Sequence, residues 1–321
     1  MAPEPGGATG RLAELLNAAG AGAGRAAPLR GPGAFSNFVY RVDDLGGGAR
    51  RRGPWVAKVY SPGCLLRTPG ARLAAAEAAV AAARPPGGPD WAAELVHAGP
   101  TGCVHRWVEG RPLDDAAVAS GAHTAALAGA LAELHGLPAV GRDEPFQIWR
   151  WFDAMASACA GLEQPAGDLR LEALLEEAER AKAAVGALGP PAAFCHGDLK
   201  PSNVLANGDG GGVTLIDFEL AGANPAAYDI AKLHRALDGS FAEGDVRRFL
   251  EAYNEAAGDE VAYEAVAALW PLTWLEAAVF FVFAACTNLN AGEAAERAAL
   301  LGLARDRRAK YESARRRRLG V

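Results

Sequence analysis

The chain has 321 residues, half of them hydrophobic, and a formal net charge of −6. This length suffices for two lobes, each with its own core, and the composition is that of a soluble globular protein. The acidic balance excludes a protein that binds nucleic acid over its whole surface. The basic run Arg315–Arg318 could contact anionic lipid or RNA, but we favour a solvated end of the chain.

Cysteine usage indicates a reducing compartment. The five cysteines are scattered without a Cys-x-x-Cys pair: Cys64, Cys103, Cys159, Cys195 and Cys286. An odd, dispersed set argues against a disulfide framework and a zinc site, so we expect a cytoplasmic protein. The first 24 residues lack the basic start and long apolar run of a secretory signal, and an organelle transit peptide stays open.

One apolar segment, Trp270–Cys286, invites comparison with a membrane span. It is short for a bilayer and contains Pro271 and Glu276. We therefore expect a buried helix and no stable membrane insertion.

The first part of the chain predicts a small antiparallel sheet with a helix. A short helix over Arg11–Asn17 precedes a Gly/Ala-rich stretch. Apolar alternation after the glycine turn at residue 31 predicts a strand through Val42, and Pro54–Tyr60 predicts its hairpin partner. Two further strands are predicted over residues 94–97 and 102–108, with the alanine-rich helix Arg72–Ala83 before them.

From Ala116 onward the pattern is helical. Apolar residues at helical spacing predict helices over 123–135, 146–160, 169–188, 245–257, 261–285 and 291–318. We expect His135 to be a packed histidine at a helix end rather than a ligand. Asp229, at the start of a further helix, is expected to brace a neighbouring loop or to cap that helix.

One short stretch carries the densest set of chemically useful side chains. It reads His196-Gly197-Asp198-Leu199-Lys200-Pro201-Ser202-Asn203 and is followed by two β-prone runs separated by a glycine-rich break. That break predicts a hairpin, with Asn203 at its entry and Asp217 at its exit. Because the two ends of a hairpin lie side by side, these oxygen-bearing side chains should converge.

Converging carboxylate and amide oxygens suit Mg²⁺, a hard cation. Phosphoryl transfer requires a metal, positioning and one residue that accepts the proton of the attacking hydroxyl. We therefore expect Asn203 and Asp217 to bind Mg²⁺ and Asp198 to act as the base. The alternative is an ordinary surface hairpin in which these residues serve turns and caps.

The pattern His-x-Asp-x-x-x-x-Asn followed by apolar-Asp-Phe resembles the catalytic and metal-binding loops of the kinase-like superfamily. The glycine-turn strand and the Val-Ala-Lys-Val strand resemble a kinase amino-terminal lobe. This resemblance implies that Ser36 and Asn37 lie at the nucleotide, that Lys58 reaches its phosphates and that Glu77 pairs with Lys58. A solvent-facing strand lysine and an exposed helix glutamate are the alternatives.

The resemblance implies an α+β, two-lobed fold with a small antiparallel β N-lobe and a larger, mainly α-helical C-lobe. We expect a flexible N-terminal segment with a short helix (1–30), a nucleotide-binding lobe (31–110), a catalytic and acceptor-binding lobe (111–312) and a basic tail (313–321). ATP would lie between the lobes, with the backbone of Trp107 and Val108 facing the adenine edge.

The chain is most similar to the small-molecule branch that includes aminoglycoside phosphotransferases and choline/ethanolamine kinases. Protein kinases match less well, because Asp-Phe-Glu replaces Asp-Phe-Gly at Asp217 and no Ala-Pro-Glu-like activation segment follows. Gly33–Asn37 and Ile216–Ile230 are similar to the nucleotide and metal loops of the choline/ethanolamine kinases. Leu220 stands where that family usually has tyrosine, and Ala236 lies near the place of an acidic residue.

The implied function is ATP- and Mg²⁺-dependent phosphorylation of the hydroxyl of a small metabolite, of the choline/ethanolamine type. Asp198 would take the proton, and Lys200 would stabilise charge on the γ-phosphate. A cationic acceptor would suit the remaining candidate residues, namely the acidic Glu219 and Glu276 and an aromatic wall of Trp270 and Trp274. The core is the alternative place for the two tryptophans.

Other functions stay open. One is an aminoglycoside or other sugar or amine phosphotransferase, and another is a catalytically silent kinase fold that serves as a binding module. The sequence leaves the oligomeric state open.

Overall fold

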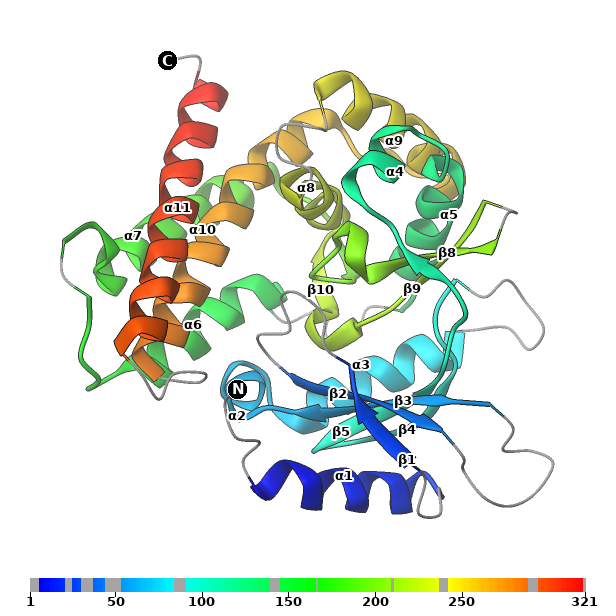
Figure 1. Cartoon of the computed structure of the whole chain (residues 1–321). Coiled ribbons are helices and arrows are strands. Elements are labelled where there is room, and N and C mark those ends of the chain that lie inside the picture. Colours follow the sequence, from blue (N-terminus) through cyan, green and yellow to red (C-terminus); the bar gives the residue numbers. More distant parts are fainter. Residues whose placement is uncertain are drawn as a thin grey trace.

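The computed structural model places a small β lobe against a larger helical lobe (Figure 1). It describes residues 6–20, 25–29, 37–43, 53–83, 91–138, 145–165, 167–208, 211–236, 242–287 and 294–319. The two-lobed α+β fold expected from the sequence is confirmed.

The β lobe is built on one antiparallel sheet with the strand order β1-β2-β3-β5-β4. Its strands are β1 (Arg25–Pro28), β2 (Asn37–Asp43), β3 (Trp55–Tyr60), β4 (Leu95–Gly99) and β5 (Gly102–Arg106). The predicted hairpin of β2 and β3 forms, with Val39 opposite Lys58. Because side chains alternate along a strand, Lys58 points to the face opposite that of Ala57 and Val59.

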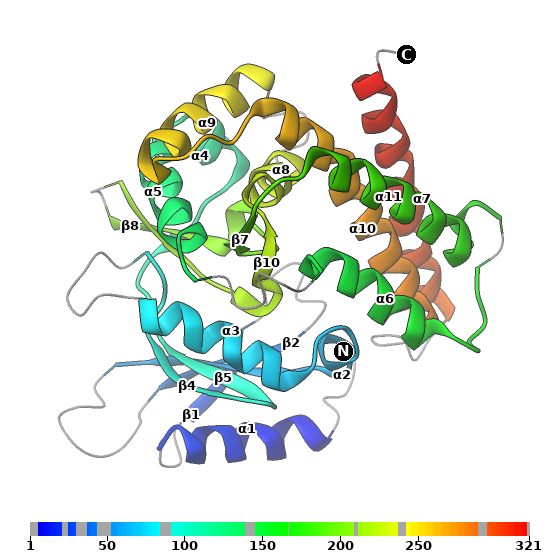
Figure 2. The same ribbon diagram turned by 180° about the vertical axis from the view of Figure 1, so that it is seen from behind.

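Helices cover both faces of this sheet (Figure 2). α1 (Gly6–Ala18) lies on one face, where Leu12, Leu15 and Leu16 pack with apolar residues of β2, β3 and β5. α3 (Gly70–Ala83) lies on the other face, next to the short helix α2 (Pro62–Arg67).

The short helix expected within residues 1–30 forms as α1, but α1 and β1 pack on the sheet, which differs from the flexible segment that was expected. α1 contributes three buried leucines to the core of the β lobe, and β1 pairs with β2. The Gly/Ala-rich composition concealed this, because the apolar contacts of α1 come from a few leucines on one helical face.

The second lobe is mainly helical, as expected. Its helices are α4 (Asp115–Ala119), α5 (Thr124–His135), α6 (Gln147–Cys159), α7 (Leu171–Leu188), α8 (Ala226–Ala236), α9 (Glu243–Ala257), α10 (Tyr263–Thr287) and α11 (Ala294–Leu319). Single 3-10 turns occur at Gly167–Leu169, Pro201–Asn203 and Phe218–Leu220. Two small sheets are embedded among the helices, β6-β8-β9 and β7-β10.

These small sheets frame the loops of interest. They consist of β6 (Arg111–Pro112), β7 (Ala192–Cys195), β8 (Val204–Asn207), β9 (Gly212–Leu215) and β10 (Gly222–Pro225). β8 and β9 are the predicted hairpin. Because β6 pairs with β8, the chain passes from one lobe to the other between Arg106 and Arg111, next to the expected boundary.

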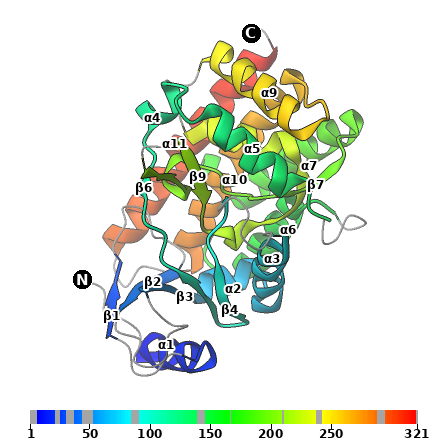
Figure 3. The same ribbon diagram turned by 90° about the vertical axis from the view of Figure 1, so that its right-hand side faces the viewer.

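α10 passes through the middle of the helical lobe and packs against α11, α8, α6 and α7 (Figure 3). Among the described helices it alone is long and apolar enough to cross a membrane, but 78% of its most apolar window is buried inside the structure. The predicted buried helix is confirmed.

The basic tail expected at residues 313–321 is not a separate segment as far as the structure describes it. α11 continues to Leu319, and Arg315 donates a hydrogen bond to Glu177 of α7 over 2.8 Å. α11 places Tyr311 and Ala314 in the core, and the arginines that follow belong to the same helix.

Replacing Leu15 with alanine tests whether α1 belongs to the lobe. Leu15 is buried against the sheet, so Leu15→Ala should lower the free energy of unfolding by about 2–5 kcal/mol. The neighbouring Glu14 is exposed, and Glu14→Ala should change it by less than about 0.5 kcal/mol. Denaturant titration followed by circular dichroism measures both, and equal effects would mean that α1 is detached.

Candidate active site

The loop between β7 and β8 carries Asp198, and Asp229 of α8 holds this loop in place. The Asp229 carboxylate accepts hydrogen bonds from the backbone N–H groups of His196 (2.6 Å) and Gly197 (2.8 Å). His135 Nε2 lies 3.0 Å from the same carboxylate. Asp229 thus braces the loop, and His135 is the packed histidine that was expected.

Gly197 is required by the shape of this loop. Its φ is +80°, in the left-handed region that disfavours side chains, and a Cβ would collide with the Leu220 carbonyl oxygen. The loop therefore passes directly against the segment that follows Asp217.

The hairpin brings Asn203 and Asp217 together, as the sequence suggested. The Ile216 N–H donates to the Asn203 carbonyl over 3.0 Å and joins the two ends of the hairpin. Asn203 Nδ2 donates to the Asp198 carbonyl over 3.0 Å, so its amide oxygen is the atom that it can offer to a cation. Asp217 has φ 72°, the only positive φ among the described non-glycine residues. Strain of this kind concentrates at functional sites.

Three cations surround the carboxylate of Asp198. Lys200 Nζ lies 2.7 Å from Oδ2, whereas Lys232 Nζ and Arg235 Nη2 each lie 3.9 Å from Oδ1. Burial alone would raise the pKa of Asp198, but these three charges outweigh burial and hold the pKa well below its ordinary value. Asp198 is therefore a carboxylate at neutral pH.

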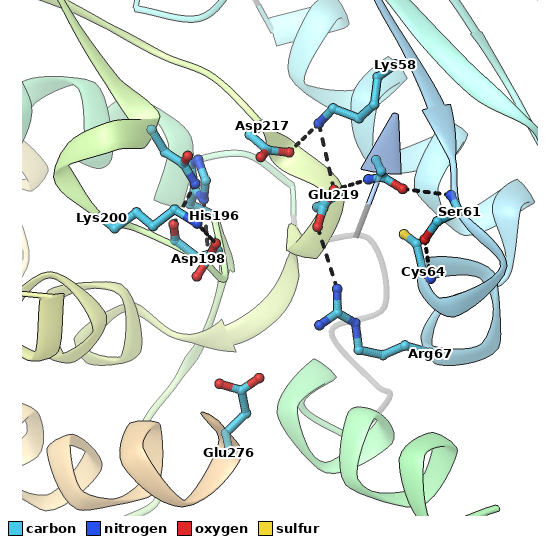
Figure 4. Close-up of polar contacts among 12 residues, drawn as sticks. Lys58, Ser61, Cys64, Arg67, His196, Asp198, Lys200, Asp217, Glu219 and Glu276 are labelled. Carbon is cyan, nitrogen blue, oxygen red and sulfur yellow. Dashed lines mark hydrogen bonds and ion pairs between the residues drawn. The ribbon is translucent and has the colours of Figure 1, made fainter. Parts of the chain in front are cut away.

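Lys58 of β3 reaches across from the β lobe to the hairpin (Figure 4). Its ammonium group contacts Asp217 and lies 3.9 Å from Glu219 Oε2. Burial alone would lower the pKa of Lys58, but Asp217 and Glu219 hold it well above its ordinary value. Lys58, expected at the nucleotide phosphates, thus faces Asp217, which is expected at the metal.

The expected direct pairing of Glu77 with Lys58 is not what the described residues form. Glu77 is buried in α3, and its carboxylate lies 3.1 Å from His105 Nε2 and accepts from the Cys103 thiol over 3.5 Å. Burial alone would raise the pKa of Glu77, but His105 lowers it. His105 and Cys103 are two residues apart on β5 and share one face of the sheet, which is why they occupy the glutamate.

Glu219 does not lie on the acceptor side, where the sequence reading placed it. Its carboxylate contacts the Asn37 side chain and lies 3.6 Å from Arg67, so it faces the β lobe (Figure 4). Asn37 also accepts from the Ser61 N–H over 3.0 Å and thereby links both lobes. Ser36 and the glycine turn before it lie outside the described residues.

The segment expected at the adenine edge follows β5. The Trp107 N–H donates to the Pro54 carbonyl over 3.0 Å, and Arg41 stacks 4.4 Å above the Trp107 ring. The Trp107 N–H is therefore not the donor for adenine, because the sheet already uses it. The backbone of Val108 and the Trp107 carbonyl stay predictions.

Glu276 and Trp274, expected in a cationic acceptor pocket, already contact cations of the protein, and Trp270 packs against a histidine ring. Glu276 accepts from Lys232 over 2.8 Å. Trp274 is buried, and Trp270 lies 4.7 Å from the ring of His234. Both tryptophans pack in or against the core, so the alternative placement is the observed one.

Sequence reasoning missed Arg67, His105, Lys232 and Arg235. The two α8 residues could have been found, because Asp229, Lys232 and Arg235 follow one another at intervals of three, which places them along one helical face. Arg67 and His105 gave no such signal, since only the packing of α2 and β5 brings them to the site.

The fold and the loop geometry define a kinase-like phosphotransferase scaffold. The chain belongs to the phosphotransferase enzyme family, whose model matches residues 29–269. It is similar to mouse ethanolamine kinase 1, with 28% identity over 186 residues that cover 49% of this chain and 49% of that protein. The chain thus spans about half the length of this curated relative.

Solved structures share the fold. A Plasmodium vivax ethanolamine kinase superposes with a TM-score of 0.68 at 13% identity, over 89% of this chain and 82% of that one. The structure of LicA in complex with AMP gives a TM-score of 0.68 at 15% identity, over 96% of this chain and 100% of that chain.

The buried Asp229 should make the fold sensitive to acid. Burial alone would raise its pKa, but its hydrogen bonds to His135 and Gly197 lower it, so the unfolded chain binds a proton more readily than the folded one. The stability that Asp229 contributes is present above the unfolded pKa of about 4 and is lost as the pH falls through the folded pKa.

Asp229→Asn should lower the free energy of unfolding at pH 7 by about 2 kcal/mol or more, because the loop loses charge-assisted hydrogen bonds. Its stability should also fall less steeply between about pH 5 and pH 3. Urea titrations across this range measure both, with the exposed Asp115→Asn as control. Parallel pH profiles for Asp229→Asn and the wild type would contradict the assignment.

Proposed function

We propose that the chain transfers the γ-phosphoryl group of ATP to the hydroxyl of a small metabolite of the amino-alcohol class, to which choline and ethanolamine belong. The observation that carries this proposal is the placement of Asp198, Asn203 and Asp217 on one loop and hairpin, with Lys58 opposite them. Family membership and the names of the similar proteins support it. We place the reaction in the cytoplasm, in keeping with five free thiols.

Asn203 and Asp217 fit Mg²⁺ by the chemistry of their donors. Asn203 offers an amide oxygen because its nitrogen is engaged, and Asp217 offers carboxylate oxygens. When bound, Mg²⁺ neutralises phosphate charge and aligns the transferred group. Lys58, which contacts Asp217, is within reach of phosphate oxygens at the same place.

Asp198 is poised to orient the acceptor hydroxyl and to take its proton. The low pKa keeps it ionised, so it accepts a hydrogen bond from the hydroxyl and receives the proton as the new O–P bond forms. The bond between the γ-phosphorus and the bridging oxygen breaks, ADP leaves, and the proton passes from Asp198 to solvent. Lys200, which donates a hydrogen bond to Asp198, lies where it can balance negative charge on the transferred phosphoryl group.

Removing the base should abolish transfer without abolishing nucleotide binding. Asp198→Ala should reduce kcat by at least about a thousandfold while the Kd for ATP changes little, because Lys58 and the hairpin are untouched. Coupled ADP release measures turnover and calorimetry measures binding. Asp153→Ala, on the exposed face of α6, is the control. Retention of most activity in Asp198→Ala would show that the base has been misassigned.

The metal assignment predicts a change in Mg²⁺ dependence. Asn203→Ala and Asp217→Asn should each raise the Mg²⁺ concentration for half-maximal activity by about tenfold or more, because each removes an oxygen ligand or its charge. Asn207→Ala changes the same hairpin at its turn end, where the side chain bonds Thr214, and should leave the Mg²⁺ requirement unchanged. An unchanged requirement in all three variants would exclude Asn203 and Asp217 as ligands.

A further inference from the structure

α8 presents two cations to the side of Asp198 that faces away from Lys200. Lys200 engages Oδ2, whereas Lys232 and Arg235 both approach Oδ1 at 3.9 Å. If Lys200 marks the side of the phosphoryl group, Oδ1 and α8 mark the side from which the acceptor hydroxyl comes. On this assignment, which follows from the proposed function, Lys232 and Arg235 lie next to the acceptor.

Among the residues that the structure describes, Glu276 and Trp274 were expected to attract a cationic acceptor, and both already have cationic partners. Glu276 accepts from Lys232 over 2.8 Å and has Arg235 Nη1 at 3.9 Å. The face of Trp274 has Arg235 at 5.7 Å, Arg307 at 5.5 Å and Lys310 at 4.8 Å from its ring centre. An ammonium ion entering here would compete with side chains that are part of the fold.

Lys200, Lys232 and Arg235 therefore engage Asp198 and Glu276, and Lys200 also interacts with Asp217 and Glu219. Because Asp198 and Glu276 already have cationic partners, an ammonium group entering here gains little from them, whereas an anionic group can pair with Arg235.

Arg235 is the more accessible of the two α8 cations. Its Nη1 donates to the Thr273 carbonyl over 3.2 Å, which fixes the guanidinium plane. Its side chain is 15% exposed, whereas that of Lys232 is 2% exposed and bonded to Glu276. A planar, fixed guanidinium matches carboxylate and phosphate oxygens through paired hydrogen bonds.

We propose that the acceptor alcohol carries an anionic oxygen group, a carboxylate or a phosphate ester, that binds Arg235. Lys232 is a positioning residue that neutralises Glu276. This inference rests on the proposed phosphoryl transfer, since it concerns the acceptor of that reaction. For an amino-alcohol it means a zwitterion, such as a hydroxylated amino acid, in place of choline or ethanolamine.

Matched acceptor pairs test the inference, because each pair differs by one anionic group. L-Serine is ethanolamine with a carboxylate, L-homoserine relates in the same way to 3-aminopropanol, and glycerol 3-phosphate relates by a phosphate to glycerol. For the anionic acceptor that the enzyme uses best, we expect kcat/KM to exceed that of the matched acceptor without the anionic group by about tenfold to a hundredfold. The first two pairs report on a carboxylate and the third on a phosphate.

Arg235→Gln provides the second arm of the test. Loss of the guanidinium also affects Asp198, so the ratio of kcat/KM within a pair is compared, and effects on the base cancel. The ratio should fall about tenfold or more, and Arg235→Lys should restore part of it. Arg247→Gln, on the exposed surface of α9, should leave the ratio unchanged.

The outcomes separate this inference from the proposed function. Turnover of ethanolamine or choline at least as efficient as that of every anionic acceptor would overturn the anionic site and leave phosphoryl transfer standing. Absence of turnover with any acceptor would contradict the proposed function. The site is then judged by calorimetry with the acceptors themselves. Tighter binding of the anionic member, lost in Arg235→Gln, supports it, and equal binding overturns it.

Discussion

The site depends on one buried carboxylate, Asp229, that binds two consecutive backbone N–H groups of the catalytic loop. A buried carboxylate is costly unless its oxygens are satisfied, and here His135 completes the set. Because α8 supplies Asp229, the same helix fixes the loop and presents Lys232 and Arg235 to Asp198. One helix therefore sets both the position of the loop and the cations that lie next to Asp198.

The two lobes meet through compensated charge. Lys58 and Arg67 of the β lobe face Asp217 and Glu219 of the helical lobe, and Asn37 joins the same network. The contact between Lys58 and Asp217 couples the expected phosphate-binding residue to the expected metal ligand. Charge brought by nucleotide and metal would enter a site whose cations and carboxylates already balance one another, so binding should rearrange these pairs rather than create new ones.

The sequence predicted what short-range pattern controls. The β2–β3 and β8–β9 hairpins, the longer helices and the meeting of Asn203 with Asp217 followed from alternation, helical spacing and turn residues. It failed where tertiary packing decides. The Glu77 carboxylate pairs with His105, because β5 places that imidazole on the face of the sheet that Glu77 contacts. The Glu219 carboxylate faces the β lobe, because Arg67 of α2 lies next to it there.

The acceptor side shows the same limit more sharply. Glu276 and Trp274 read as a pocket for a cation when they are considered alone, yet Lys232 and Arg235, only three residues apart on α8, occupy both. Residue type alone did not reveal this, because the partners come from α8 and α10, far apart in the chain. The helical spacing of Lys232 and Arg235 from Asp229 places all three on one side of α8. That spacing indicates a role at the site only once Asp229 is known to bind the loop.

The most direct measurement is the fate of γ-labelled ATP incubated with the protein, Mg²⁺ and a small-molecule extract, with Asp198→Ala in parallel. Label should appear in an organic phosphate monoester with the wild type and not with the variant, and the product should carry an anionic group besides the new phosphate. Recovery of the label only in ATP and inorganic phosphate with both proteins would contradict phosphoryl transfer by this site.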